Sequence, residues 1–311
     1  MKKFVTEELI FMTVAGSRMY GTNIASSDVD KRGVCVPPRI VELGFARNFN
    51  QQEYEGEDTT VFSLSKFMKL ASECNPNIIE LLFAPEDMIE TITPTWEKLL
   101  EKKDMFLSAK AYYTFTGYAH QQLKRIKGHR VWLRNPPTHN PTREEYGLTQ
   151  AGQGVRDLAR GIDLAEIAPE VLQVIEKEKA YKAAQTKWDQ YQKWKKERNP
   201  ARAALEAAHS YDTKHAMHLM RLLRMGKEIL TTGKIVVRRP DAEELLEIRG
   251  GKWDYDQLVE QAESLKSELD AVYEAKTYVV PFGPPKVEIS DFCVELLDYH
   301  WTHHAKITKD E

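Results

Sequence analysis

The sequence is poor in cysteine. Its three cysteines, Cys35, Cys74 and Cys293, lie far apart and form no CxxC pair. Disulfide frameworks and cysteine-based zinc sites need thiols that are paired at recognisable spacings. We therefore expect neither kind of site, and a reducing compartment, the cytoplasm, is the expected location.

The sequence also lacks long apolar runs. No run approaches the ~20 residues that a membrane-spanning helix requires. The apolar character of the N-terminal stretch ends at the polar residues 6–8, so this stretch does not read as a signal peptide. We expect a soluble protein with no membrane partner.

One segment of the chain lacks acidic residues. The whole chain has a formal net charge of −3, which gives no general reason to expect nucleic-acid binding. Residues 105–143, however, contain no Asp or Glu. The cations there are Lys110, Lys124, Arg125, Lys127, Arg130, Arg134 and Arg143. This segment, 110–143, also contains aromatic residues, and we expect it either to bind a nucleic-acid acceptor, RNA foremost, or to pair with acidic helices such as 242–247.

The N-terminal part predicts two strands around a polar turn. Leu9–Val14 is short, apolar and bounded by a glycine, which is typical of a buried strand. Residues 29–36 form a second apolar run that stops at two prolines. Between them lie Gly16, where the backbone can approach a ligand closely, and the pair Asp28 and Asp30. Side chains alternate along a strand, so this pair is expected on one face.

A third strand is expected at residues 59–63, where β-branched and aromatic residues follow an acidic loop. Asp58 stands at the start of this strand. Beyond Trp96 the periodicity becomes helical almost throughout. The expected fold class is α+β: a small domain with a mixed sheet over residues 1–95, then a mostly helical domain over 96–311.

These polar residues can be assembled into one phosphate-processing site. Asp28, Asp30 and Asp58 would bind two Mg²⁺ ions, or Mn²⁺ in their place, because hard divalent cations prefer carboxylate oxygens. Gly16 and Ser17 would hold the terminal phosphates of a nucleotide through backbone amides. The basic residues Lys214, His218 and Arg221 recur at i, i+4 and i+7 on a predicted helix, and would neutralise the triphosphate.

The order Gly16-Ser17, short helix, Asp28-x-Asp30 resembles the signature of the DNA polymerase beta-type nucleotidyltransferase superfamily. The segment GSRMYGTNIASSDVDKRGV is more narrowly similar to a bacterial and phage family of predicted nucleotidyltransferases, some of them linked to RNA repair. Further patches of likeness are DTTVFSLSKFMKLASECNPNIIELLF, YTFTGYAHQQLKRI, YDTKHAMHLMRLL and LLEIRGG.

The resemblance implies metal-dependent transfer of a nucleotidyl group from an NTP, ATP among them, with release of pyrophosphate. Asp28 and Asp30 would bind the metals, Asp58 would assist and take the proton of the acceptor, and Arg18 would join the nucleotide-binding residues. The helical domain would close over nucleotide and acceptor. One departure concerns the third acid, which in the superfamily usually lies within a strand between hydrophobic neighbours. Asp58 lies at a strand's start, so Glu55 and Glu57 are rivals.

Two other function classes fit parts of the pattern. The chain could be a nucleotide-binding module without catalysis, such as the regulatory half of a defence or toxin-antitoxin type pair, although the acidic pair argues against this. A glycosyltransferase would use its Asp-x-Asp to hold a metal and a sugar nucleotide. Such an enzyme would have a larger α/β region before the acidic pair, whereas Asp28 follows a single predicted strand.

Overall fold

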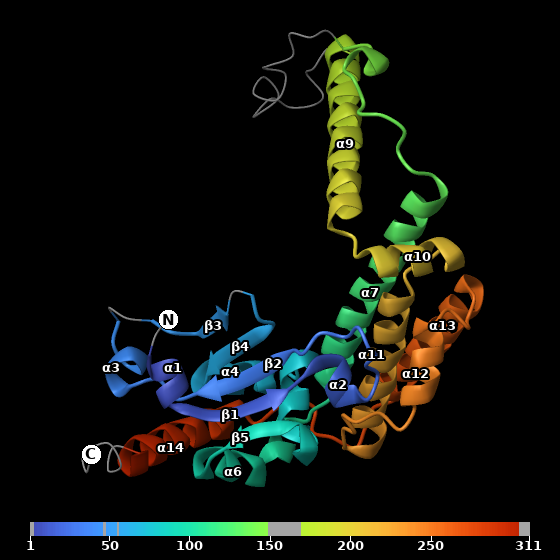
Figure 1. Ribbon diagram of the computed structural model, residues 1–311. Helices are drawn as coiled ribbons and strands as arrows, with labels where there is room; N and C mark the ends of the chain where they lie inside the picture. The colour runs from blue at the N-terminus through green and yellow to red at the C-terminus, as the bar shows by residue number, and fades with distance from the viewer. Residues whose placement is uncertain (1–2, 46–47, 55, 149–168, 305–311) are drawn as a thin grey trace. The chain divides into compact units, whose positions relative to one another are not determined.

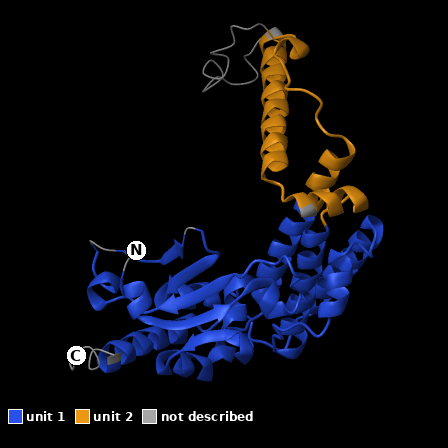
Figure 2. Cartoon of the chain, in the orientation of Figure 1, with its two compact units in different colours: residues 1–125, 213–311 blue, residues 126–212 orange. Residues whose placement is uncertain are grey.

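The computed structural model describes residues 3–45, 48–54, 56–148 and 169–304 (Figure 1). It divides into two compact units (Figure 2). Unit 1 comprises residues 1–125 and 213–311, and unit 2 comprises residues 126–212. The expected division into functional domains at residue 95 stays a prediction, because compactness divides the chain elsewhere.

Unit 1 contains a mixed sheet of five strands in the order β3-β4-β2-β1-β5. The strands are β1 (Leu9–Val14), β2 (Lys31–Cys35), β3 (Gln51–Tyr54), β4 (Thr59–Ser63) and β5 (Ile89–Ile92). The β2 and β4 strands run parallel, and the other neighbours are antiparallel. A mixed sheet followed by a mostly helical region confirms the α+β class.

Helices alternate with the strands up to β5, and the described chain after β5 is mostly helical. Before residue 126 begin α1 (Phe4–Glu7), α2 (Gly16–Tyr20), α3 (Arg39–Glu42), α4 (Leu64–Ser72), α5 (Pro76–Ile79), α6 (Pro94–Glu101) and α7 (Ala111–Arg134). After it come α9 (Pro169–Glu197), α10 (Pro200–His209), α11 (Thr213–Thr232), α12 (Ala242–Arg249), α13 (Tyr255–Glu274) and α14 (Lys286–His304). Single helical turns are η1 (Glu80–Phe83), η2 (Glu86–Met88), η3 (Lys103–Phe106) and η4 (Glu144–Tyr146). Within the described residues, no helix combines the length and apolar character needed to cross a membrane.

The core of unit 1 lies between the sheet and the helices α4, α6 and α14, which pack against the sheet or one another. Trp96 of α6 is fully buried, with its ring stacked on Phe11 of β1 at 4.0 Å between centroids. Its ring also lies 5.1 Å from that of Phe67 in α4. Burial of large aromatic surfaces from three elements stabilises the sheet that carries the site.

Of the three strands expected above, two have the predicted bounds and one starts later, while β3 and β5 were not expected. β1 has the expected bounds, and β4 begins directly after Asp58. β2, however, begins at Lys31 rather than at residue 29, so Asp28 and Asp30 precede the strand. The reason is local: the chain turns at residues 24–27, where the Ser27 hydroxyl accepts a hydrogen bond from the Ile24 amide at 2.9 Å, and regular pairing starts only at Lys31.

Candidate functional site

The site contains Gly16, which lies just after β1 and is the first residue of α2. Its φ is +63°, and a Cβ at this position would lie 2.3 Å from Oδ2 of Asp30. The amide of Ala15 donates to the carbonyl of Asp30 at 2.8 Å. The glycine turn and the second member of the acidic pair are therefore in direct contact, and a side chain at position 16 would displace the carboxylate.

The three predicted acids are accessible to a cation. Asp30 is half-buried, and among the described residues its ionic partner is Arg32, at 4.0 Å. Asp28 and Asp58 are exposed and have no ionic partner within the described ranges. Carboxylates that lack close cations can supply the oxygen ligands of Mg²⁺ or Mn²⁺, so the donor set fits such a metal.

Asp58 lies near Asp30 because of the strand register. Lys31 and Thr59 are the first paired residues of the parallel strands β2 and β4, so Asp30 and Asp58 each stand one residue before the pairing begins. The Lys31 amide donates to the Asp58 carbonyl at 2.8 Å. Of the two rivals for the third acid, Glu57 is exposed in the turn before β4, and Glu55 lies outside the described residues. Asp58 as third acid stays a prediction.

A hollow of about 410 Å³ opens next to Gly16 and Asp30. The strand register places Arg32 of β2 beside Thr60 of β4, and Thr60 beside Glu53 of β3. All of these line the hollow; its remaining lining residues include Phe62, Leu70, Asn75, Asn77 and Glu80. Arg32, Glu53 and Thr60 also line a neighbouring hollow of about 510 Å³ that contains Asp58.

Glu53 was missed as a site residue by the sequence analysis. It belongs to a short polar strand, residues 51–54, in which no apolar alternation marks a buried face. Only its pairing with β4 brings it into the same hollow as Asp30. Its own stretch of sequence therefore carries no local signal of this role.

A buried polar cluster forms the wall of the hollow behind Gly16. The Tyr20 hydroxyl donates to Oε1 of Glu80 at 2.5 Å, and Arg221 of α11 lies 3.4 Å from Oε2 of the same carboxylate. The Arg221 guanidinium also lies 3.8 Å from the centre of the Tyr20 ring. Burial raises the pKa of Glu80, an effect that Arg221 and the Tyr20 hydrogen bond oppose. Burial likewise raises the pKa of Tyr20 well above its usual range.

This cluster corrects the expected basic ladder on α11. Lys214 is exposed and His218 half-buried, but Arg221 is only 4% exposed and pairs with Glu80. The three residues therefore do not form one solvent-facing row, because α11 packs with its Arg221 side against Tyr20. A sequence signal for the cluster existed in Glu80, a lone charge between Ile78-Ile79 and Leu81-Leu82. Charges inside apolar runs are usually buried and paired.

The remaining predicted nucleotide-binding residues lie on α2. Ser17 and Arg18 follow Gly16, and the Arg18 guanidinium donates to the Ser27 carbonyl at 3.1 Å. This bond ties α2 to the turn that precedes Asp28. At the other end of α2, Gly21 has a φ of +75°, which ends the helix.

The basic segment 110–143 is partly neutralised. Lys110 pairs with Glu73, and Arg143 pairs with Glu178. The acidic helix that was considered as its partner is engaged elsewhere: Glu244 pairs with Arg224, and Glu247 with Lys252. Four cations of the segment have no ion pair within the described ranges: Lys124, Arg125, Lys127 and Arg134.

Residues 1–135 match the RNA repair pathway DNA polymerase beta family (RlaP). The matched range contains Gly16, both acids of the pair, Asp58, Glu53 and Glu80. The resemblance read from the sequence is thus confirmed over these residues.

An uncharacterised protein of 38.9 kDa from the nrdC-mobD intergenic region of Enterobacteria phage T4 is 26% identical over 130 residues. The alignment covers 37% of this chain and 38% of the phage protein. No solved structure matches the chain significantly. The family match covers residues 1–135, and the activity, the acceptor and the metals are the subject of a proposal.

We expect Gly16→Ala to lower the free energy of unfolding by at least about 1 kcal/mol, because a left-handed conformation is unfavourable for alanine and its Cβ would clash with Asp30. Gly117→Ala is the matched control, since nothing lies within 4 Å of its added Cβ in helix α7. That control should gain about 0.5–1 kcal/mol. Chemical denaturation measures both, and an unchanged Gly16→Ala protein would contradict the contact.

His218 should make the stability of unit 1 depend on pH. Burial, followed by the charges of Arg221, His215, Lys214 and Arg249, lowers the pKa of His218 well below 6.5. The unfolded chain then binds a proton that the folded chain does not, so the stability present above pH 6.5 is lost as the pH falls below it.

The slope from this residue approaches about 1.4 kcal/mol per pH unit. Denaturation at a series of pH values below neutrality should show a shallower loss for His218→Gln than for the parent chain. His120→Gln, at an exposed position of α7, is the control and should keep the parental slope. Parallel curves for all three proteins would refute the assignment.

Proposed function

We propose that this protein is a metal-dependent nucleotidyltransferase that moves an NMP group from an NTP to an acceptor hydroxyl, the end of an RNA in the first instance. The observation that carries the proposal is the contact between Gly16 and Asp30 at the mouth of a polar hollow. It joins a phosphate-compatible backbone turn to one carboxylate of the acidic pair. The family match over residues 1–135 supports the same reaction class.

The carboxylates Asp28 and Asp30 would hold Mg²⁺, with Asp58 as the third ligand. When bound, the metal ions supply Lewis acidity that activates the acceptor oxygen and stabilises the leaving pyrophosphate. Accessible carboxylates without close cationic partners fit this role, because a tight ion pair would otherwise compete with the metal. The same oxygen donors would accept Mn²⁺.

The remaining residues would bind and orient the nucleotide. The amides of Gly16 and Ser17 would face the terminal phosphates, and Arg18 would add positive charge at the same turn. Lys214 and His218 would approach from α11. Arg221 would act differently from the other two, since it already neutralises Glu80 and braces the ring of Tyr20 behind the turn.

In the transfer step, one bond to the α-phosphorus of the NTP would form and another would break. A bond forms between the acceptor oxygen and the α-phosphorus, while the bond from that phosphorus to the bridging oxygen of pyrophosphate breaks. The proton of the acceptor hydroxyl passes to the Asp58 carboxylate. Asp58 is exposed, so it can return the proton to solvent after each turnover.

The direct test is transfer of label from α-labelled NTPs to candidate acceptors in the presence of Mg²⁺. Asp28→Ala and Asp30→Ala should each lose more than the ~10- to 100-fold that removal of an indirect metal contact costs. Asp256→Ala, at an exposed position of α13, should keep full activity. Transfer by the Asp28→Ala/Asp30→Ala double variant at the parental rate would contradict the proposal. Tight NTP binding by the parent chain without turnover would favour a regulatory module.

The third acid can be identified by comparing two amide substitutions that leave shape almost unchanged. We expect Asp58→Asn to lower kcat at least about 100-fold, since it removes a ligand and the proton acceptor. Glu53→Gln should change kcat by less than about tenfold, because Glu53 lies one strand further from Asp30. Steady-state rates of both variants decide the matter, and the reverse order would assign the third ligand to Glu53.

A further inference from the structure

Unit 2 contains a cluster of aromatic side chains that joins two helices. Trp132 of α7 lies 5.2 Å from Trp194 and 6.1 Å from Tyr191, both in α9, between ring centres. Trp188 extends the cluster along α9, 6.2 Å from Tyr191. None of these four rings is fully buried; each keeps part of its surface accessible. We call Trp132, Trp188, Tyr191 and Trp194 the aromatic cluster.

Cations flank the aromatic cluster on its own side of α9. The Arg198 guanidinium lies 4.1 Å from the centre of the Trp194 ring. Lys187 precedes Tyr191 by four residues and Trp194 by seven, and Lys195 follows Tyr191 by four and Trp188 by seven. Residues at these spacings share one face of a helix, so both exposed lysines lie along the aromatic stripe.

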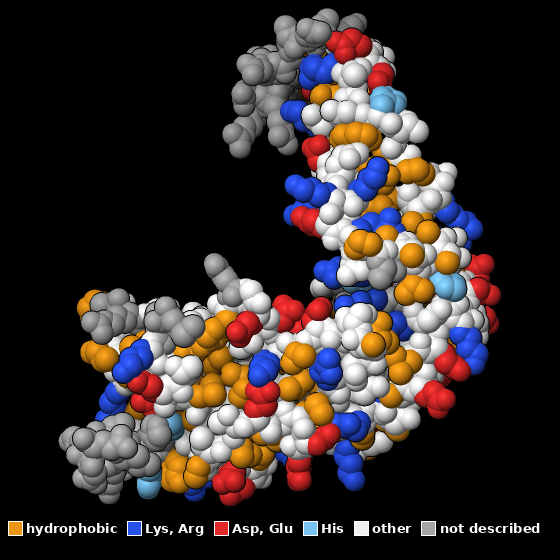
Figure 3. Space-filling model, viewed as in Figure 1, with side chains coloured by type: hydrophobic (Ala, Val, Ile, Leu, Met, Phe, Trp, Pro, Cys, Tyr) orange, Lys and Arg blue, Asp and Glu red, His pale blue; other side chains and the backbone are white. Residues whose placement is uncertain are grey.

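The positive charge of this region is largely uncompensated. Residues 179–198 contain Lys179, Lys182, Lys187, Lys193, Lys195, Lys196 and Arg198 against Asp189 and Glu197. Within the described part of unit 2, the six lysines have no ion pair, and neither do Lys127 and Arg134 of α7. Figure 3 shows Lys and Arg side chains beside hydrophobic ones along unit 2 on the face in view.

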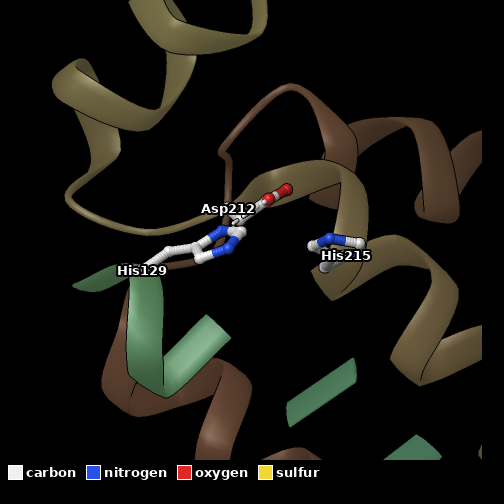
Figure 4. A group of neighbouring side chains, drawn as sticks. All are labelled: His129, Asp212 and His215. Carbon is white, nitrogen blue, oxygen red and sulfur yellow. Dashed lines mark hydrogen bonds and ion pairs between the residues drawn. The ribbon is translucent and has the colours of Figure 1, made fainter. Parts of the chain in front are cut away.

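Three carboxylates of unit 2, Glu178, Glu206 and Asp212, are paired with arginines. Glu178 pairs with Arg143, and Glu206 accepts from Arg198 and Arg202. Asp212 is fully buried and pairs with Arg202, and one oxygen lies 3.3 Å from Nδ1 of His129 (Figure 4). The third side chain in that figure, His215, belongs to unit 1. Within the described part of unit 2, none of these three carboxylates forms an ion pair with a lysine of α9.

An ordinary pair of packed helices does not need this combination. Helix packing explains why the rings contact one another. It does not explain why the rings keep accessible edges, or why the lysines beside them have no ion pair. Successive cations beside aromatic faces match single-stranded nucleic acid, whose phosphates take the charges and whose unstacked bases take the rings. A duplex stacks its bases on one another along its length, so it offers the rings few base faces. An acidic protein surface would pair with the lysines but would offer the rings no bases.

We propose that the aromatic cluster and the lysines of α9 bind single-stranded nucleic acid. Phosphates would lie along Lys187 and Lys195, and a base would stack on the accessible part of Trp188 at the end of the cluster. This surface extends the basic segment 110–143 onto a helix that the sequence did not connect with it. This proposal rests on the proposed function in one respect: the bound strand would be the acceptor of the nucleotidyl group.

The test measures binding of a fluorescent single-stranded oligonucleotide to the full chain by anisotropy, without NTP or metal. Lys187→Ala/Lys195→Ala should weaken binding at least about tenfold at low salt and should flatten the dependence of log K on log salt by about 0.7 per lost phosphate contact. Lys69→Ala/Lys234→Ala is the matched control. It removes the same charge from exposed positions of unit 1 and should leave both quantities close to the parental values.

Stacking is tested separately at Trp188, which lies at the end of the cluster. Trp188→Ala should weaken binding about fivefold or more, while Trp188→Phe should restore most of it, because phenylalanine keeps an aromatic face. Circular dichroism of each variant verifies that α9 remains folded. RNA and DNA strands of the same sequence form parallel arms that identify the preferred sugar.

Three results would overturn the proposal: no binding at low salt, equal weakening by the control pair, or duplex binding as tight as single-strand binding with no effect at Trp188. The last would indicate a purely electrostatic surface. Because binding is measured without transfer, retained binding in a protein that transfers no label would reject the proposed enzyme and leave this surface in place. Label transfer that the α9 substitutions leave unchanged would support the proposed enzyme and would reject this surface as the site that binds the acceptor.

Discussion

The close approach of Gly16 to the carboxylate of Asp30 is the constraint on which the site depends. Gly16 has a φ of +63°, and a Cβ at this position would lie only 2.3 Å from Oδ2 of Asp30, so glycine alone leaves room for that carboxylate oxygen. The sheet holds both sides of this contact, since β1 leads into Gly16 and β2 follows Asp30, and the two strands pair antiparallel. Local turn geometry and strand pairing thus place a phosphate-compatible turn and a metal-compatible acid together.

The rest of unit 1 supports this contact from behind. Glu80, Tyr20 and Arg221 come from three distant parts of the chain and form a buried hydrogen-bonded cluster next to α2. A buried ion pair of this kind contributes little net stability against apolar packing, but removal of one partner leaves a costly charge. The cluster therefore favours one position of α2 relative to α11, and so one position of the Gly16 turn.

Charged side chains are arranged differently in unit 2. In unit 1 two arginines of α11 are paired: Arg221 with Glu80, and Arg224 with Asp241 and Glu244. Along α9 the lysines lack such partners within the described residues, and they accompany partly accessible aromatic rings. Paired buried arginines hold a structure together, whereas uncompensated exposed lysines favour association with a polyanion.

The sequence by itself determined the elements whose signals are local. β1, β4, the Gly16-Ser17 turn and the family resemblance could be read directly, because apolar periodicity, glycine conformation and an ordered motif lie within short stretches. It could not place Glu53, bury Arg221 or bring Trp132 to Trp194. Those positions depend on strand register and on packing between segments far apart in the chain. Only the tertiary structure decides such contacts, because no single stretch contains both partners.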